Sequence, residues 1–235
     1  MPDQLAIRLG ARLLRANRLR ANFYRGCVVR WILGSRSPRR LELLKSFDPQ
    51  GDIRRVPPRS SDEMEFEGLH HWDEIVERSL LIAQTKYEDV WEQVAQENLE
   101  NTLILCGDTT VLCETEPGSW LAIGQPPVDD PQHQVLRNWL GQFLANRTHR
   151  VLSSCVLRLT SGELRQGSIV TNVTFRPDVE QWLDWYVSLN ESSGRAGGYA
   201  IQGVGSIFVD KIEGSLSNVI GLPLELIAEW TACRR

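Results

Sequence analysis

The residues that decide the fold are Val28-Val29-Arg30-Trp31-Ile32-Leu33, then Gly34-Ser35-Arg36-Ser37, then Pro38-Arg39-Arg40-Leu41-Glu42-Leu43-Leu44. The first run is rich in β-branched and aromatic residues, which favour a strand. The small residues of the second run predict a turn, and proline is favoured where a helix begins. The stretch therefore predicts a strand, a tight turn and a helix in that order, which is typical of an α/β protein.

This turn and the helix after it form a candidate anion site. Unpaired N–H groups and the positive dipole end at a helix N-terminus attract phosphate groups. Ser35 lies in the turn, and Arg39 and Arg40 add forked guanidinium donors that match phosphate oxygens. An ordinary capped helix with two surface arginines would show the same local pattern, so both interpretations stay open.

Hydrophobic periodicity outlines the rest of the chain. Apolar residues step by three and four through residues 72–94, which predicts a long helix, and residues 103–106 are continuously apolar, as in a strand buried on both faces. Residues 49–63 show no period and predict a loop. Other predicted strands span 150–159, 168–175 and 203–212, and other helices begin at Asp130 or span 179–186 and 224–230. The alternation predicts an α/β fold with a mixed sheet and one antiparallel pair late in the chain.

Asp108 is the second candidate site. It closely follows the apolar run 103–106, so we expect it at the carboxyl end of that strand, where open α/β sheets bind their ligands. A carboxylate there can hold a divalent cation or act on a water molecule. An aspartate that merely caps a turn beside Thr109 fits the pattern equally well.

Three weaker signals lie elsewhere in the chain. Asp62 and Glu63 could supply oxygen ligands to Mg²⁺, although acidic loops are usually only solvated. Lys86 lies at the edge of the apolar stripe of its helix, where a surface lysine is the commoner explanation. The glycine-dense segment 194–205 has no helical signal directly after it, so it is not a dinucleotide fingerprint. It is better interpreted as a loop that a ligand approaches closely, with Gln202 as a donor.

Composition excludes several classes of protein. The chain has 235 residues, 42% apolar and 24% charged, which argues against a disordered chain and a long coiled coil. Its five cysteines form no C-x-x-C pair, which argues against a disulfide framework and favours a cytoplasmic protein. A net charge of −4 argues against binding to duplex nucleic acid, and no apolar run approaches the length of a membrane span. Serine hydrolases and P-loop kinases are excluded because their motifs are missing.

Residues 1–28 are predicted to be an arginine-rich extension before a single domain over residues 29–235. Asp3 is the only acid before Arg25, a composition that fits an organelle transit peptide. A solvated helix, or a start codon assigned too early, explains the composition as well. Binding of RNA or of a partner through these arginines is a further hypothesis.

An ordered set of short motifs runs along the chain. The motifs are LGSRSPRR (33–40), Asp62-Glu63, AQTK (83–86), Gly107-Asp108-Thr109, Thr148-His149, VTFR (173–176), AGGYAIQG (196–203) and SNVIGLP (217–223). Together they resemble the Maf family of nucleotide pyrophosphatases over residues 30–231. The resemblance implies an elongated α/β fold of the Maf/ITPase-like type, with a mixed sheet, flanking helices and two lobes around a central cleft. It also implies a homodimer.

The resemblance implies hydrolysis of a nucleoside triphosphate between its α and β phosphates, with a divalent cation such as Mg²⁺, Mn²⁺ or Co²⁺. By position, Asp108 matches the family's catalytic aspartate, and Glu63 matches an acidic residue near the metal, which Asp108 would also hold. The positions that match polyphosphate-binding residues are Ser35, Arg39, Arg40 and Lys86. The positions that set substrate choice are Arg39, Thr109 and Gln202, as in the branch that acts on dTTP, UTP and modified pyrimidine nucleotides.

The chain departs from the family pattern at Gln125, where the family usually has a phosphate-facing lysine. Loss of one charge-assisted hydrogen bond is expected to weaken the site about ten- to a hundred-fold. Arg195, which replaces a lysine before the glycine block, could partly compensate. The departure supports a second hypothesis, a nucleotide-binding regulatory protein of low activity linked to cell division.

Overall fold

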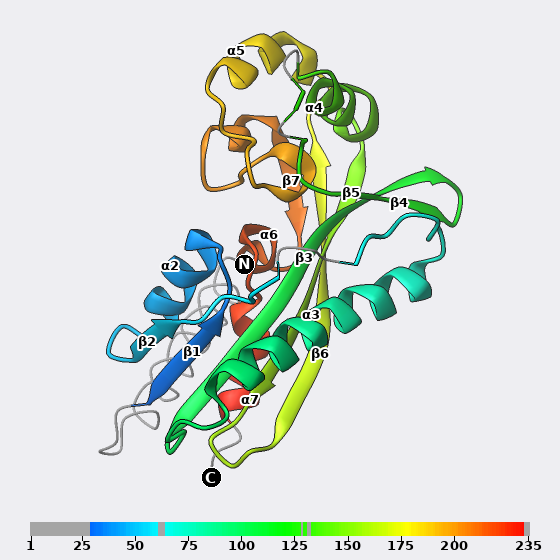
Figure 1. The fold of residues 1–235 in the computed structure, drawn as a ribbon. Helices are drawn as coiled ribbons and strands as arrows, with labels where there is room; N and C mark the ends of the chain where they lie inside the picture. Colours follow the sequence, from blue (N-terminus) through cyan, green and yellow to red (C-terminus); the bar gives the residue numbers. More distant parts are fainter. Residues whose placement is uncertain (1–28, 61–63, 128, 131–132, 233–235) are drawn as a thin grey trace, which may run out of the picture.

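The structure, a computed structural model, describes residues 29–60, 64–127, 129–130 and 133–232. The predictions on the extension 1–28 and on Asp62 and Glu63 lie outside the described residues. The described chain forms one mixed sheet of seven strands in the order β2-β1-β3-β5-β6-β7, with β4 paired to β3, and helices flank it (Figure 1). The predicted α/β class is confirmed.

The elements follow one another without an internal repeat. The strands are β1 Arg30–Gly34, β2 Asp52–Arg55, β3 Thr102–Glu116, β4 Ser119–Ile123, β5 Thr148–Arg158, β6 Leu164–Phe175 and β7 Val209–Glu213. The helices are α2 Pro38–Phe47, α3 Trp72–Val94, α4 Gln134–Asn138, α5 Leu183–Ser188, α6 Leu216–Ile220 and α7 Leu224–Ala232. Short 3-10 or π segments are η1 Trp139–Leu144, η2 Val179–Trp182, η3 Ala196–Gly198 and η4 Val204–Phe208. Within the described ranges, none of the helices has both the length and the apolar character needed to cross a membrane.

The predicted unit of strand, turn and helix is confirmed in β1 and α2. Ser37 caps α2 by accepting the backbone N–H of Arg40 on its Oγ at 3.4 Å, and Pro38 stands in the first turn. Trp31 of β1 is fully buried, and its Nε1 donates to Asp48 Oδ2, just beyond α2, at 2.9 Å. The bond from Trp31 to Asp48 ties the C-terminal end of α2 to β1, while the short turn joins its N-terminal end to the same strand.

Strand β3 is much longer than the apolar run predicts. The sequence suggests an end after Cys106, but β3 continues to Glu116 and stays buried through Cys113 apart from a half-buried Thr109. The prediction of an early end is wrong because β5 continues to pair with β3 past Cys106, with Asp108 opposite Ser154 and Thr110 opposite Leu152, so these buried polar residues stay within the strand. β1 pairs with β3 in parallel only as far as Gly34 opposite Cys106, so Asp108 still lies at the carboxyl end of β1.

The sheet contains more antiparallel pairing than the sequence predicts. β1 runs parallel to β2 and β3, whereas β3–β4, β3–β5, β5–β6 and β6–β7 are all antiparallel. The expectation of one antiparallel pair is wrong because local periodicity does not report strand direction. β2 is also missing from the sequence analysis, since only Ile53 of its four residues is partly buried and an exposed edge strand shows no apolar period.

Two further boundaries differ from the sequence analysis. The predicted strand 203–212 begins instead as the 3-10 segment η4 and becomes extended only at Val209. The helix predicted from Asp130 begins at Gln134, although the Asp130 carboxylate accepts the N–H groups of Gln134 and Val135 at 2.9 and 2.8 Å. In both places side-chain contacts to the backbone, rather than hydrophobic period, decide where the element begins.

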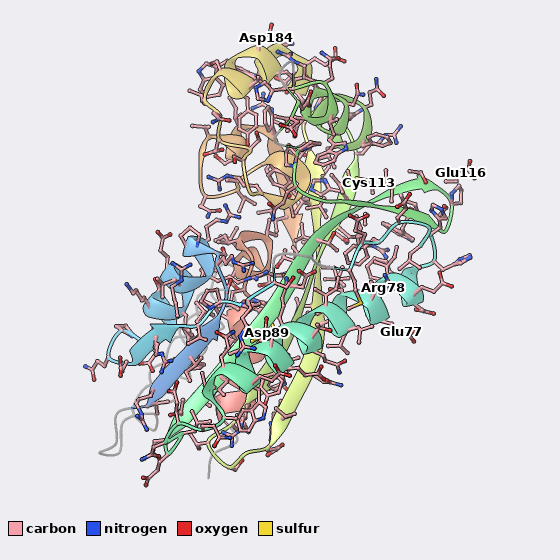
Figure 2. The ribbon with its side chains drawn as sticks, viewed as in Figure 1. Glu77, Arg78, Asp89, Cys113, Glu116 and Asp184 are labelled. Carbon is pink, nitrogen blue, oxygen red and sulfur yellow. The ribbon has the colours of Figure 1, made fainter. Side chains whose placement is uncertain are left out.

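Separate cores divide the molecule into two lobes, as expected. In the sheet lobe, one face of β1, β3 and β5 packs on α2 and α7, and the other face packs on α3. The distal lobe (residues 133–147 and 176–208) gathers α4, α5 and the η segments around Phe175, Tyr186 and Phe208. The long strands β3, β5 and β6 connect the lobes, and side chains fill both of them (Figures 1 and 2).

Candidate active site

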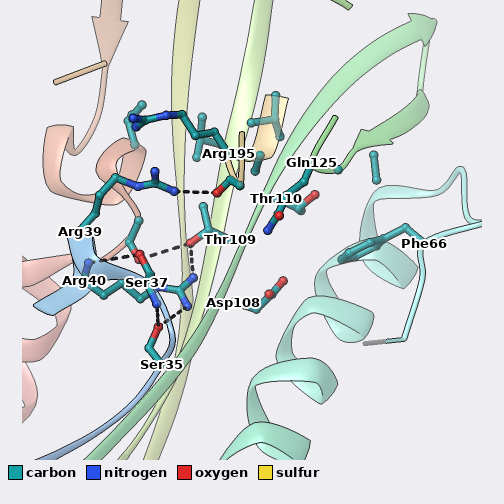
Figure 3. Close-up of a pocket in the computed structure, with 18 of the residues that line it drawn as sticks. Ser35, Ser37, Arg39, Arg40, Phe66, Asp108, Thr109, Thr110, Gln125 and Arg195 are labelled. Carbon is teal, nitrogen blue, oxygen red and sulfur yellow. Dashed lines mark hydrogen bonds between the residues drawn. The ribbon is translucent and has the colours of Figure 1, made fainter. Parts of the chain in front are cut away.

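A cleft of about 1470 Å³ lies between the sheet lobe and the distal lobe. Its walls come from the turn after β1, α3, the middle of β3 and the glycine-dense segment of the distal lobe (Figure 3). Seven residues predicted from the sequence line it: Ser35, Arg39, Arg40, Lys86, Asp108, Thr109 and Gln202. The structure thus brings together all the predicted site residues that it describes.

Asp108 and Lys86 form a buried ion pair in this cleft. Lys86 Nζ lies 2.9 Å from Asp108 Oδ1, and the two side chains are 13% and 9% exposed. Ile104 and Cys106 of β3 pack against α3, so the alternation of a strand puts Asp108 on that face as well. The explanation of Lys86 as a surface lysine is therefore wrong. The ion pair holds the Asp108 side chain in one orientation at a place where both side chains are largely buried.

Arg40 joins three segments through its guanidinium group. Its Nε donates to the Gly221 carbonyl at 2.8 Å, its Nη1 to the Gly107 carbonyl at 2.8 Å, and its Nη2 to Thr109 Oγ1 at 2.9 Å. A longer contact of 3.4 Å reaches Ser35 Oγ. Arg40 therefore positions β3 beside Asp108 and the end of α6, in addition to placing a positive charge at the cleft (Figure 3).

Arg39 reaches across the cleft to the distal lobe. Its Nη2 donates to the Gly194 carbonyl at 3.0 Å, and Figure 3 shows Arg195 beside this contact. Burial lowers the pKa of Arg39, and the positive charges of Arg195 and Arg40 lower it further. Like charges held close together favour an anion between them, so this end of the cleft suits phosphate oxygens.

Ser35 and Arg36 shape the turn itself. Ser35 is buried, and its Oγ accepts the N–H of Ser37 at 3.1 Å. The Arg36 guanidinium donates to the carbonyls of Pro58 and Ser60 at 2.5 and 3.0 Å. Arg36 therefore braces the following loop, which leaves the backbone of the turn facing the cleft.

One wall of the cleft has no counterpart in the sequence analysis. Residues 64–70 line the cleft before α3 begins, and Phe66 lies across from the arginine side (Figure 3). Phe66 also packs against the small apolar cluster around Leu112, Trp120 and Leu152. No sequence signal marks this segment, because an irregular loop without a period becomes a wall only when a distant strand packs on it.

The oxygen donors of the cleft are suited to a cation that arrives with its ligand. No group of three or more acidic, histidine or cysteine side chains that could hold a metal occurs among the residues the structure describes. Asp108 supplies one buried carboxylate, and Mg²⁺ is commonly held by one or two carboxylates together with substrate phosphates. The residues present therefore fit a metal shared with a polyphosphate.

His149 supports the glycine-dense wall from behind. It is fully buried, and its Nε2 lies 2.8 Å from the Tyr199 hydroxyl, while Nδ1 has no hydrogen-bond partner among the described residues. Its ring also meets Phe175 edge-on, with centroids 4.9 Å apart. Burial lowers the pKa of His149 to about 3, so the imidazole is neutral at neutral pH.

This burial predicts a loss of stability in mild acid. An unfolded histidine titrates near pH 6.5, so between pH 6.5 and about 3 the unfolded chain binds a proton that the folded chain does not. The free energy of unfolding should then fall with pH by about 1.4 kcal/mol per unit. Urea titrations at pH 7 and pH 5 should show this slope in the wild type and in His70→Gln, which changes an exposed histidine. His149→Phe should remove most of it, and an unchanged slope would contradict the assignment.

The fold and the site together define an α/β protein with an interlobe cleft that sets one buried carboxylate among several cations. Comparison with known proteins is consistent with that class. A family described as Maf-like protein matches residues 30–232. The dTTP/UTP pyrophosphatase of Brucella abortus is 34% identical over 197 residues, which cover 83% of this chain and 86% of that protein. The dTTP/UTP pyrophosphatase of an Anaeromyxobacter species is 34% identical over 209 residues, with 86% and 88% covered.

Among solved structures, the Ham1 protein of Staphylococcus aureus shows a remote likeness, with a TM-score of 0.38 and 13% identity over 63% of this chain and 72% of that one. The family match and the relatives show that the chain belongs to the Maf-like protein family. The resemblance inferred from its motifs is confirmed.

Proposed function

We propose that the protein is a nucleoside triphosphate pyrophosphatase that converts dTTP, UTP and modified pyrimidine nucleotides to the monophosphate and pyrophosphate. The observation that carries the proposal is the buried Lys86–Asp108 pair, set in a cleft with Arg39, Arg40 and Arg195. Its relatives bear the name dTTP/UTP pyrophosphatase. The cleft also exceeds the roughly 300–1,000 Å³ usual for small-molecule sites, so it has room for a nucleotide.

In the proposed reaction a water oxygen bonds to the α-phosphorus, and the bond from this phosphorus to the oxygen bridging to the β-phosphate breaks. Asp108 accepts a proton from the water, and Lys86 holds the carboxylate in position. Arg39, Arg195 and the backbone of the Ser35 turn hold the phosphates and stabilise charge on the departing pyrophosphate. A divalent cation held by Asp108 and Glu63 would offset the phosphate charge.

We assign discrimination between bases to Arg39, Thr109 and Gln202. Thr109 is the most constrained of the three, because its Oγ1 accepts from Arg40 and lies 2.8 Å from Ser153 Oγ. Gln202 is exposed on the facing wall of the cleft. A hydroxyl and an amide that are held in place can distinguish bases by hydrogen bonding more sharply than an apolar pocket can.

Pyrophosphate release by the purified protein tests the proposal. The panel holds dTTP, UTP, 5-methyl-UTP, CTP, 7-methyl-GTP and ATP, each with Mg²⁺, Mn²⁺ or Co²⁺. We expect selective turnover of dTTP and UTP that requires the metal. Binding of a nucleotide without turnover of any of them would favour the alternative, a regulatory nucleotide-binding protein. The cytoplasmic location and the homodimer stay predictions.

A gain of activity is expected from Gln125→Lys. Gln125 is exposed, lines the cleft, and has its Oε1 4.0 Å from the position of a Cβ built on Gly194. A lysine there adds a third cation beside Arg39 and Arg195, so kcat/KM for dTTP should rise about tenfold. The matched control is Gln181→Lys on η2, an exposed glutamine outside the cleft lining, which should leave kcat/KM unchanged. A fall in kcat/KM for Gln125→Lys would mean that the glutamine already makes the required contact.

A further inference from the structure

Glu191 is a carboxylate that contacts two parts of the cleft wall without lining the cleft. Its Oε1 accepts the N–H of Val204 at 3.0 Å, and its Oε2 accepts the N–H of Gly205 at 2.8 Å. Its main-chain carbonyl accepts Nε of Arg195. A single residue therefore fixes the backbone directly after Gln202 and the side chain of Arg195.

The turn that presents Gln202 is closed from both ends. On one side the Gly203 N–H donates to the Ala200 carbonyl at 3.2 Å, and on the other the two bonds to Glu191 hold the start of η4. A charged acceptor makes such bonds shorter and stronger than a neutral one. With both ends held, the position of Gln202 depends directly on the Glu191 carboxylate.

Gly203 provides the space that this contact needs. A Cβ built on Gly203 would lie 1.9 Å from Glu191 Oε1. The φ angle of Gly203 is −115°, which any residue can adopt, so the requirement is for space rather than for an unusual backbone conformation. A methyl group at this position would displace the carboxylate while leaving Glu191 itself unchanged.

The charge of Glu191 also acts on Arg39 and on Tyr186. Its carboxylate opposes the lowering of the Arg39 pKa, and burial together with the same carboxylate raises the pKa of Tyr186. The Tyr186 hydroxyl donates to the Gly198 carbonyl at 2.9 Å, inside the glycine-dense wall. Glu191 thus contacts this wall through its carboxylate and its main-chain carbonyl, and its charge acts on groups at the wall.

We propose that Glu191 is a positioning residue that sets base selectivity by holding the turn of Gln202 through its carboxylate. The inference rests on the proposed function, because Gln202 is assigned there to base discrimination. Glu191 does not line the cleft, so its loss should change discrimination between nucleotides more than it changes kcat for dTTP.

The test compares the ratio of kcat/KM for dTTP to that for CTP in wild type, Glu191→Gln, Gly203→Ala and the double variant. This ratio does not depend on how much of the protein is folded. Each single variant should lower it about tenfold, the loss expected for about one charge-assisted hydrogen bond. The double variant should match the larger single effect rather than the product, because both changes remove the same contact. Glu180→Gln, an exposed carboxylate of the distal lobe, is the control and should leave the ratio unchanged.

An unchanged ratio in both single variants, or effects that multiply in the double variant, would overturn the proposal for Glu191. Dissociation constants for non-hydrolysable analogues of dTTP and CTP separate this failure from that of the proposed function. If the wild-type protein binds these analogues selectively but turns over neither nucleotide, the proposed pyrophosphatase activity is refuted. The wild type, the two single variants and the double variant then test the role of Glu191 through the ratio of their dissociation constants for the two analogues. A wild-type protein that binds neither analogue overturns both.

Discussion

Asp108→Asn should lower kcat for pyrophosphate release from dTTP by about 10²–10⁴-fold, the contribution usual for a positioned general base. The asparagine is nearly isosteric, and its Oδ1 can still accept from Lys86 Nζ, which lies 2.9 Å from the carboxylate oxygen in the wild type. What the substitution removes is a group that can take a proton and bear a negative charge. The fold of β3 around it should remain, because the flanking backbone pairs are unchanged.

Nucleotide binding separates this loss from unfolding. Asp108→Asn removes a negative charge from a cationic cleft, so its dissociation constant for a non-hydrolysable dTTP analogue, measured without the divalent cation that Asp108 would hold, should stay the same or fall. Asp210→Asn, an exposed aspartate of β7, is the matched control and should retain full activity. Pyrophosphate release that persists in Asp108→Asn at the wild-type rate would refute the assignment of the site.

Arg40→Lys should have the second largest effect, and it should act on stability and activity together. Lysine keeps the charge but cannot reproduce three short bonds, two to Gly107 and Thr109 of β3 and one to Gly221 after α6. Each half-buried carbonyl left without a donor costs about 1–3 kcal/mol, so the free energy of unfolding should fall by about 3 kcal/mol. We expect kcat/KM to fall about a hundred-fold, because β3 beside Asp108 is no longer held.

The neighbouring arginine is the matched control for this experiment. Among the described residues, Arg39 makes one bond, at 3.0 Å to the Gly194 carbonyl, and it lies at the cleft. Arg39→Lys should therefore weaken nucleotide binding while changing the free energy of unfolding by no more than about 0.5 kcal/mol. Equal losses of stability in the two variants, measured by urea unfolding, would show that Arg40 is not the structural clamp of the cleft.

Much of the site could be predicted from the sequence because its chemistry lies in short contiguous motifs. The turn between β1 and α2 has its proline, cap and arginines in consecutive positions, so local rules suffice to place them. Asp108 could be located for a different reason. It closely follows a continuously apolar run, and such a run indicates a strand buried on both faces. The predicted end of that strand is wrong, yet Asp108 still lies at the carboxyl end of a strand, because β1 ends beside it.

The contacts that hold the site together could not be predicted in this way. Arg40 and Gly221 are separated by 181 residues, and Arg39 and Gly194 by 155, so no local period relates them. Lys86 illustrates the same limit. In the sequence its position at the edge of an apolar stripe is typical of a surface lysine, and only the folded structure brings Asp108 of β3 against it. Glu191 lies in a segment where the sequence shows no signal at all.

The sequence by itself determined the α/β class, the unit of β1 and α2 and the length of α3. These follow from side-chain volume, period and backbone preference, which act between residues a few positions apart. The candidate site residues came mainly from the resemblance of its short motifs to the Maf family. The tertiary structure alone decided the direction of the strands, the extension of β3 past Asp108, the wall formed by residues 64–70 and the pairing of Lys86 with Asp108. Those features depend on burial and hydrogen bonding between segments far apart in the chain, which exist only once the two lobes have packed.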